Sequence, residues 1–102
     1  MADDIQLQEI FSVTLADLTR ASGLSVAEVH ELVDLGAFEP QTQTGEWLFA
    51  SHCIELARAA RRLQSDFELP LAGVAIAITY LERIRELEQR VRELECQLLG
   101  VR

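Results

Sequence analysis

Hydrophobic residues recur at helical spacing in two short segments near the start of the chain. In the first segment, Leu15 and Leu18 stand three residues apart and supply a stripe that can be buried. Thr14 can cap this helix, because Asp17 follows three residues later in the capping-box position. Gly23 can adopt the left-handed conformation that ends many helices, so we expect the first helix to end there.

A second helix is predicted directly after this glycine. Ser25 and Glu28 form the S-x-x-E pattern of a capping box, and Gly36 marks the end of the helix. Its inner face is formed by residues at the spacing i, i+3 and i+4, which are Val29, Leu32 and Val33. Residues 14–36 therefore read as helix, four-residue turn with a glycine, and helix, which is the sequence form of a helix-turn-helix.

The pattern changes between residues 37 and 49, where polar residues surround Gly45 and the run Trp47-Leu48-Phe49 follows. It predicts two short strands around a glycine-containing tip, a hairpin that is called a wing when it follows a helix-turn-helix. Residues 1–12 mix polar and apolar types and suit a short edge strand or an ordered arm.

Two further helices complete the prediction. Ser51 is expected to cap a third helix of about sixteen residues. Pro70 suits the first position of a fourth helix, because that position needs no backbone N–H. This fourth helix is predicted to run from Leu71 to about Leu99. Its first half is apolar on all sides and is expected to be buried, whereas its second half is charged apart from one seam.

The seam follows a heptad repeat, which is the pattern of a coiled coil. Its a positions are Ala77, Ile84, Val91 and Leu98, and its d positions are Tyr80, Leu87, Leu94 and Val101. We expect a homodimer whose interface contains Ile84, Leu87, Val91, Leu94 and Leu98. The alternative is that the seam packs back on the third helix of its own chain.

Charged positions beside the seam bear on the orientation of the dimer. A parallel pair would place Arg83 beside Glu88 of the other chain and Arg90 beside Glu95. Each exposed pair contributes only about 0.3–0.5 kcal/mol, so this preference is weak. The sequence therefore leaves the orientation, parallel or antiparallel, open.

The charge balance limits the partners of the chain. It has 102 residues with 9 Arg, no Lys and 17 Asp plus Glu, and a net charge of −8 at pH 7. Duplex DNA repels such a chain, and a basic protein surface is the easier partner. The sequence contains no run of about 18 apolar residues, so no membrane span is predicted. The acidic N-terminus lacks the features of a signal peptide, so we expect a cytoplasmic protein. Cys53 and Cys96 form no CxxC motif, and we expect both thiols to be reduced.

The sequence lacks the patterns that carry catalysis. His30 and His52 lie on different predicted elements, and neither has a Cys or carboxylate at metal-ligand spacing. There is no glycine-rich phosphate loop and no H-E-x-x-H or G-x-S-x-G motif. We therefore expect no enzymatic activity, no cofactor, no metal site and no small-molecule substrate.

The order of helix-turn-helix, wing, third helix and long fourth helix resembles the MerR-type winged-helix proteins. The resemblance is carried by residues 15–25, by Leu35-Gly36 and by Pro40 before the wing. It implies an all-α fold with a small β-hairpin wing, in which residues 1–69 form a winged helix-turn-helix domain with an N-terminal arm. Residues 70–102 would form the long C-terminal coiled-coil helix, packed at its start and dimerising at its end.

The second helix nevertheless lacks the chemistry of a DNA-reading helix. Glu28, Glu31 and Asp34 recur every three residues and are expected to form an outward acidic stripe, and the helix has no Arg. Base edges and phosphates are contacted mainly by Arg, Lys, Asn and Gln. The wing has no basic residue between Gln41 and Glu46 either, so direct nucleic-acid binding is not expected.

A second resemblance rests on residues spread along most of the chain. They are Gly23-Leu24-Ser25 with Glu28 and Glu31, Leu35-Gly36, Glu39-Pro40, Trp47-Leu48-Phe49, His52, Arg58-Ala59, Arg61, Leu63 and Gly73-Val74-Ala75-Ile76-Ala77. They make the chain similar to the CbpM-type chaperone modulators. This resemblance implies a protein that binds the J-domain of a CbpA-like co-chaperone of the DnaJ class. It also implies that the protein blocks stimulation of the DnaK-type chaperone and reduces the DNA binding of the co-chaperone.

Six residues are candidates for contact with such a partner: Glu28, Glu31, Asp34, Trp47, Asp66 and Glu68. The three carboxylates of the second helix could pair with basic side chains, although a merely solvated face has the same pattern. Asp66 and Glu68 lie at the corner between the third and fourth helices. Trp47 is either an exposed interface anchor or packed under its own hairpin.

Two other functions remain as alternatives. The first is a MerR-like DNA-binding transcriptional regulator, which would use the arginines Arg20, Arg58, Arg61 and Arg62. The last three form a compact basic cluster, for which pairing with nearby carboxylates is the simpler expectation. The second is an antitoxin or anti-regulator that masks some other basic protein.

Overall fold

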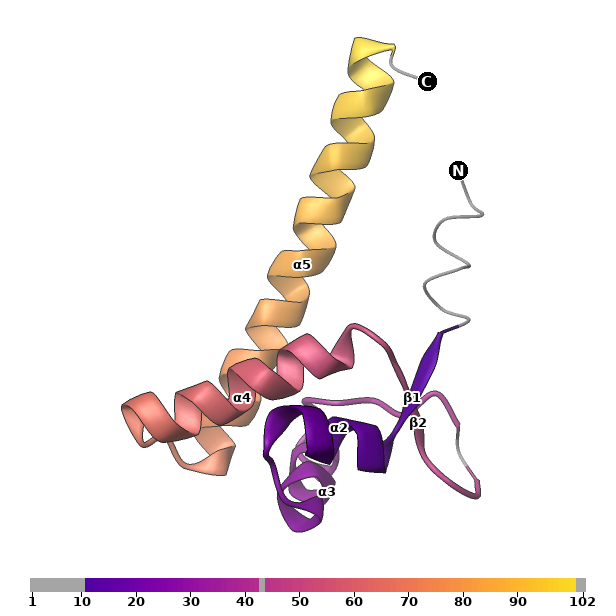
Figure 1. Cartoon of the computed structure of the whole chain (residues 1–102). Coiled ribbons are helices and arrows are strands. Elements are labelled where there is room, and N and C mark those ends of the chain that lie inside the picture. Colours follow the sequence, from indigo (N-terminus) through magenta and orange to yellow (C-terminus); the bar gives the residue numbers. More distant parts are fainter. Residues whose placement is uncertain (1–10, 43, 101–102) are drawn as a thin grey trace.

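The computed structural model describes residues 11–42 and 44–100, and in this part of the chain helices dominate (Figure 1). The elements are β1 (Ser12–Thr14), α2 (Leu15–Ser22), α3 (Val26–Asp34), β2 (Leu48–Ala50), α4 (Cys53–Phe67) and α5 (Leu71–Leu99). The predicted fold class is confirmed: a mostly helical chain with a small two-stranded antiparallel sheet and a long C-terminal helix. The expectations for residues 1–10 and for Val101 lie outside the described residues.

Both capping boxes predicted for the helix-turn-helix are present. The Thr14 backbone N–H donates to Oδ2 of Asp17 at 3.0 Å, and the Asp17 N–H donates to the Thr14 hydroxyl at 3.1 Å. Ser25 and Glu28 exchange the same two bonds at 2.9 and 3.1 Å. Gly23 has the left-handed φ of 88° that was expected at the end of α2. Local sequence therefore fixes both helix starts and the turn between them.

The wing differs from the prediction in its strand pairing. β2 pairs antiparallel with β1, with Ser12 opposite Ala50, so the expectation that residues 37–49 supply both strands is wrong. Within the described part of the loop, the Gln41 N–H donates to the Leu48 carbonyl at 2.7 Å, and the Thr42 hydroxyl donates to the Glu46 carbonyl at 2.9 Å and accepts from the Leu48 N–H at 3.2 Å. Threonine side chains compete with sheet pairing in this way.

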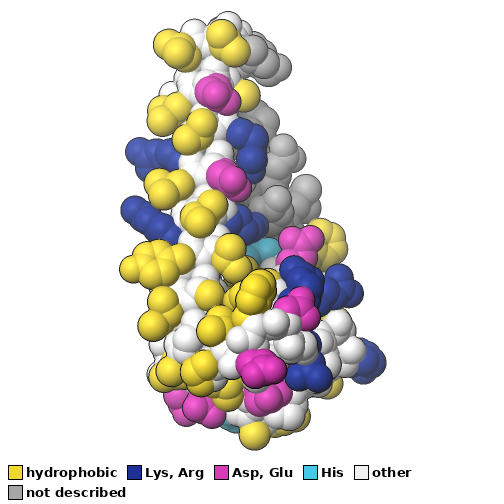
Figure 2. Space-filling model, turned by 90° about the vertical axis from the view of Figure 1, so that its left-hand side faces the viewer, with side chains coloured by type: hydrophobic (Ala, Val, Ile, Leu, Met, Phe, Trp, Pro, Cys, Tyr) yellow, Lys and Arg dark blue, Asp and Glu magenta, His cyan; other side chains and the backbone are white. Residues whose placement is uncertain are grey.

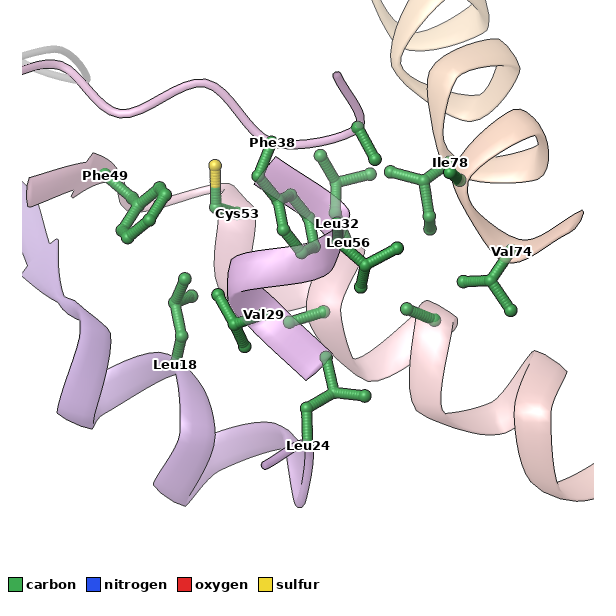
Figure 3. Close-up of a cluster of buried hydrophobic side chains, with 14 residues drawn as sticks. Leu18, Leu24, Val29, Leu32, Phe38, Phe49, Cys53, Leu56, Val74 and Ile78 are labelled. Atoms are coloured by element: carbon green, nitrogen blue, oxygen red, sulfur yellow. The ribbon is translucent and has the colours of Figure 1, made fainter. Parts of the chain in front are cut away.

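A single cluster of buried side chains joins all four helices and the sheet (Figure 3). Leu18 comes from α2, Val29 from α3, Phe49 from β2 and Ile78 from α5, and each is fully buried. We call the part of the molecule built around this cluster, residues 11–78, the head. α4 lies at its centre, because it packs against both α2 and α5.

The cap of α4 differs from the prediction by one residue, whereas α5 runs from Leu71 to Leu99 as predicted. His52, not Ser51, is the N-cap of α4, and it makes no side-chain capping bond. Its imidazole Nε2 instead lies 3.0 Å from Oε2 of Glu82 on α5. Pro70 is the N-cap of α5 and not its first residue. A contact between helices thus takes the place of a local cap at the start of α4.

The first half of α5 is not buried on all sides, and that prediction is wrong. Val74, Ala75 and Ile78 are buried against the head, whereas Ile76 and Tyr80 are 61% and 65% exposed. On a helix of 3.6 residues per turn these two groups fall on opposite sides. The apolar character all round the first half therefore reflects two separate apolar faces, of which only one is packed within the described chain.

Beyond the head, α5 projects as a single helix (Figure 1). Its exposed apolar residues form a continuous column on the projecting part (Figure 2). Packing of this column on α4, the alternative considered from the sequence, does not occur in the described residues. None of the described helices is both long enough and apolar enough to cross a membrane.

The two capping carboxylates make the head sensitive to acid. The pKa of Asp17 is lowered chiefly by the hydrogen bond from the Thr14 backbone, and the pKa of Glu28 chiefly by that from the Ser25 backbone. A lowered folded-state pKa means that the stabilisation is present at neutral pH. It is lost as the pH falls below the ordinary pKa values of 3.8 and 4.5.

Glu28→Gln tests this acid sensitivity. A carboxylate at a helix N-terminus contributes about 0.3–1 kcal/mol, so we expect the variant to be less stable than the natural chain by that amount at pH 7. The difference should shrink between pH 7 and pH 3, because the stabilisation is lost as the pH falls through the lowered pKa of Glu28. Urea unfolding followed by circular dichroism at both pH values measures it. Glu31→Gln on the exposed side of α3 is the control, and a pH-independent loss in Glu28→Gln would contradict the assignment.

Candidate protein-interaction surfaces

The three carboxylates of α3 do not form one free stripe. Oε1 of Glu28 accepts from the Ser25 N–H, and its Oε2 accepts from the Gln64 side chain of α4 at 3.1 Å. Glu31 and Asp34 are exposed, and neither carboxylate has a hydrogen bond or ion pair within the described residues. Glu28 therefore serves the fold, and the two other carboxylates remain available to a partner.

Trp47 of the wing packs against His30 of α3. Its ring centroid lies 4.5 Å from that of His30, and it meets the ring of Phe49 edge-on at 6.1 Å. The side chain is only half-buried by these contacts. Trp47 is thus packed on one side and accessible on another, which combines the two alternatives considered from the sequence.

A groove opens beside Trp47, between α2, α3 and the wing loop. It has a volume of about 590 Å³ and is lined by Leu15, Ala16, Thr19, Val26, His30, Gly45, Glu46 and Trp47. We call this the wing groove. Of these residues only Trp47 was among the sequence candidates. The sequence offered one indication of the other lining residues: Val26 and His30 stand one helical turn apart on the outer side of α3.

The second acidic candidate lies at the opposite end of the head. Asp66 and Glu68 are exposed at the corner between α4 and α5, far from the wing in Figure 1. Neither makes an ion pair with a described residue. Glu68 ends α4 in the left-handed conformation, with φ of 54°, which is uncommon for a residue other than glycine.

The arginine cluster lies on α4, away from the α3 surface that would face DNA in a reader of the major groove. Arg58 donates from Nε to the Ala21 carbonyl at 3.3 Å. Arg61 lies beside Gly23, and Arg62 is exposed. The expected ion pairs are not found for these three arginines among the described residues.

The predicted dimerisation residues are exposed along one side of α5. Ile84, Leu87, Val91 and Leu94 are each about half exposed, and Leu98 is more so. Between them a shallow depression of about 420 Å³ is lined by Ile84, Leu87, Glu88, Val91 and Arg92. Together with Ile76 and Tyr80 we call this column the α5 seam.

The interior holds little reactive chemistry in the described part of the chain. No group of three or more His, Cys, Asp or Glu residues is placed to hold a metal ion there. A cavity of about 270 Å³ beside the His52–Glu82 contact is lined partly by Cys53. Burial raises the pKa of the Cys53 thiol to about 11, so this thiol is protonated at neutral pH and is a packing residue.

Comparison with known proteins agrees with this architecture. Residues 13–96 match the family described as "MerR HTH family regulatory protein". The "Chaperone modulatory protein CbpM" of Citrobacter koseri is 34% identical over 82 residues, which cover 79% of this chain and 81% of the relative. The proteins of the same name from Escherichia coli K12 and Shigella boydii serotype 18 are each 33% identical over 86 residues, covering 83% of this chain and 85% of the relatives.

The chain belongs to the CbpM family. The resemblance read from the sequence is thereby confirmed, and so is the MerR-type character of the fold. The MerR match begins in β1 and ends near the end of α5, so it covers both the head and the projecting helix. The wing groove and the α5 seam up to Leu94 lie within the residues that match the MerR family model.

Proposed function

We propose that this chain is a non-enzymatic chaperone modulator that binds the J-domain of a CbpA-like, DnaJ-class co-chaperone. In this role it inhibits the co-chaperone and DNA-binding activities of its partner. The observation that carries the proposal is the charge of α3: the helix that would read DNA presents Glu31 and Asp34, exposed and without partners among the described residues. Such a surface repels phosphate and attracts a basic helix. Its place of action is then the cytoplasm.

We also propose that the active form is a homodimer joined along the α5 seam. The long column of exposed apolar residues on α5 supports this dimer. A projecting helix cannot bury such a column without a second helix beside it. The segment that starts at Pro70 would thus anchor in the head and dimerise beyond it.

The proposal is tested by titrating the isolated J-domain into the purified protein in a calorimeter. We expect 1:1 binding per chain that weakens several-fold between about 0.05 M and about 0.3 M salt, because exposed charge pairs are screened. The double variant Glu31→Lys/Asp34→Lys should bind at least about 10-fold more weakly. Added to a DnaK-type ATPase assay, the natural chain should suppress stimulation by the co-chaperone.

The matched control is Glu55→Lys/Glu93→Lys, which changes the net charge equally but lies on α4 and α5. It should bind the J-domain like the natural chain. No measurable binding by the natural chain would refute the proposal. Submicromolar, sequence-selective binding to duplex DNA in a gel shift would instead favour the transcriptional regulator.

A further inference from the structure

The cavity beside the His52–Glu82 contact lies between the head and the projecting helix, and the proposed function makes no use of it. Its walls come from the loop after α3, the start of α4 and the part of α5 that includes Thr79 and Glu82. We call it the α5 cavity. Phe38 and Leu56, which belong to the buried cluster of Figure 3, give it an apolar side. Its volume of about 270 Å³ is just below the range of sites for drug-sized ligands, so it suits a smaller ligand.

The polar side of the α5 cavity is acidic. Glu39 belongs to the loop wall, and Glu82 and Glu86 stand one helical turn apart on the α5 wall. Within the described residues, Glu39 makes no ion pair, and the ion pair of Glu86 is an exposed contact with Arg83 at 3.6 Å. Arg85 of the same helix pairs with none of the described carboxylates. Three carboxylates therefore line one small cavity with little compensating charge from the described chain.

Glu82 gives a second, independent indication of a ligand. Its Oε2 lies 3.0 Å from Nε2 of His52, whereas its Oε1 is buried and has no hydrogen-bond partner among the described residues. A buried acceptor without a donor is unfavourable, and such groups in proteins are usually satisfied by the chain, by water or by a ligand. Burial raises the pKa of the Cys53 thiol, which also lines the cavity, and the negative charge of Glu82 raises it further. The carboxylate therefore acts on the cavity as a negative charge.

The distribution of the carboxylates indicates the kind of cation that fits. In the part of the chain that the structure describes, no three His, Cys, Asp or Glu residues are placed to hold one metal ion. A lysine side chain of a partner would bring a single charge, although carboxylates come from both the loop wall and the α5 wall. A short aliphatic chain with a positive charge at each end can reach both walls. Its methylene groups would cover Phe38 and Leu56, as the stems of long cationic side chains do on apolar surfaces.

We propose that the α5 cavity binds a small aliphatic diamine or polyamine. One ammonium group pairs with Glu82 and Glu86 and donates to Oε1 of Glu82, and the other pairs with Glu39. The ligand thereby connects the loop after α3 to α5, so its binding holds the projecting helix against the head. This site goes beyond the proposed function and does not depend on binding of a J-domain.

Titration of 1,4-diaminobutane into the purified full chain, in a calorimeter at low salt, tests the proposal. We expect saturable binding of one diamine per chain. 1-Aminobutane, which carries one charge, should bind about 10-fold more weakly or worse, because it pairs with one wall only. 1,4-Butanediol has the same length and no charge, and it should not bind measurably.

Two variants separate the α5 cavity from the general acidity of the chain. Glu86→Gln removes one carboxylate of the cavity and leaves the His52–Glu82 contact in place, and we expect about 5- to 10-fold weaker diamine binding. The matched control is Glu93→Gln, which makes the same change two turns further along α5 and should bind like the natural chain. Ala50→Leu keeps every carboxylate but places a larger side chain in the cavity, so it should abolish binding.

The thiol of Cys53 reports where the diamine binds. In a Cys96→Ser background it is the only thiol, and saturating diamine should slow its alkylation by iodoacetamide several-fold. No measurable binding of the diamine would overturn the proposal and leave the cavity to water. Equal affinities of Glu86→Gln and Glu93→Gln would also overturn it, because the diamine would then bind the acidic surface without a defined site. Neither result bears on binding of the J-domain, which is measured separately.

Discussion

Replacing Leu87 and Leu94 with aspartate is expected to dissociate the proposed dimer into monomers while the head stays folded. Both side chains lie in the middle of the α5 seam, about half exposed in the single chain. Complete burial of a leucine stabilises by about 1.5–3 kcal/mol, so the four half-exposed leucines of two chains contribute about 3–6 kcal/mol. Their removal alone raises the dissociation constant by about 100-fold or more, and four carboxylates brought together raise it further.

Sedimentation equilibrium over a range of protein concentrations measures this change. The matched control is Gln89→Asp/Cys96→Asp, which adds the same charges to the same helix but on the side away from the α5 seam. The control should remain a dimer. A natural chain that stays monomeric at every concentration would contradict the assignment, and so would a Leu87→Asp/Leu94→Asp variant that still dimerises.

Phe49→Ala is expected to produce the largest loss of stability within the head. Phe49 is fully buried on β2 and meets Phe38 edge-on at a centroid distance of 6.5 Å. It also supports Trp47, so it connects the core to the wing groove. Truncation of a buried phenylalanine to alanine typically costs about 3–5 kcal/mol. That is a large fraction of the about 5–15 kcal/mol by which most domains are stable.

Urea unfolding monitored by circular dichroism gives the free energy of unfolding for this comparison. Phe67→Ala is the control, because Phe67 at the end of α4 is 69% exposed and its truncation should change stability by less than about 0.5 kcal/mol. Equal effects of the two substitutions would mean that the core is not where the structure places it. If Phe49→Ala is too unstable to purify, Phe49→Leu should show a smaller loss in the same direction.

Much of the helical framework could be predicted from the sequence because its signals are local. A capping box involves residues three positions apart, and Thr14 with Asp17 or Ser25 with Glu28 is sufficient to start a helix. The left-handed glycine at Gly23 is equally local. The heptad repeat of α5 could be recognised in the same way, since the period of the apolar residues does not depend on the rest of the fold.

The features that the sequence did not reveal depend on contacts between distant residues. The pairing of β1 with β2 joins Ser12 to Ala50, and no local pattern distinguishes it from a hairpin closed within the wing. His52 meets Glu82 across 30 positions, so the start of α4 could not be read from a capping motif. The capping role of Glu28 could be predicted, but its hydrogen bond with Gln64 could not, because Gln64 lies on another helix.

The candidate site shows the same division. The sequence showed correctly that α3 is rich in carboxylates. It did not show that the three carboxylates wind around the helix and so do not share one face. Residues at i, i+3 and i+6 drift by about a sixth of a turn at each step, so Asp34 lies about a third of a turn around the helix from Glu28, which faces α4. The apolar floor of the wing groove could be found only once α2, α3 and Trp47 were placed together.

The two-sided character of α5 has a consequence for how a dimer would engage its target. Because the seam lies opposite the side that packs on the head, two chains joined along it would carry their heads on the outer flanks of the pair. A target with two J-domains could be held bivalently, and the second contact would form at a high effective concentration even if each single contact were weak.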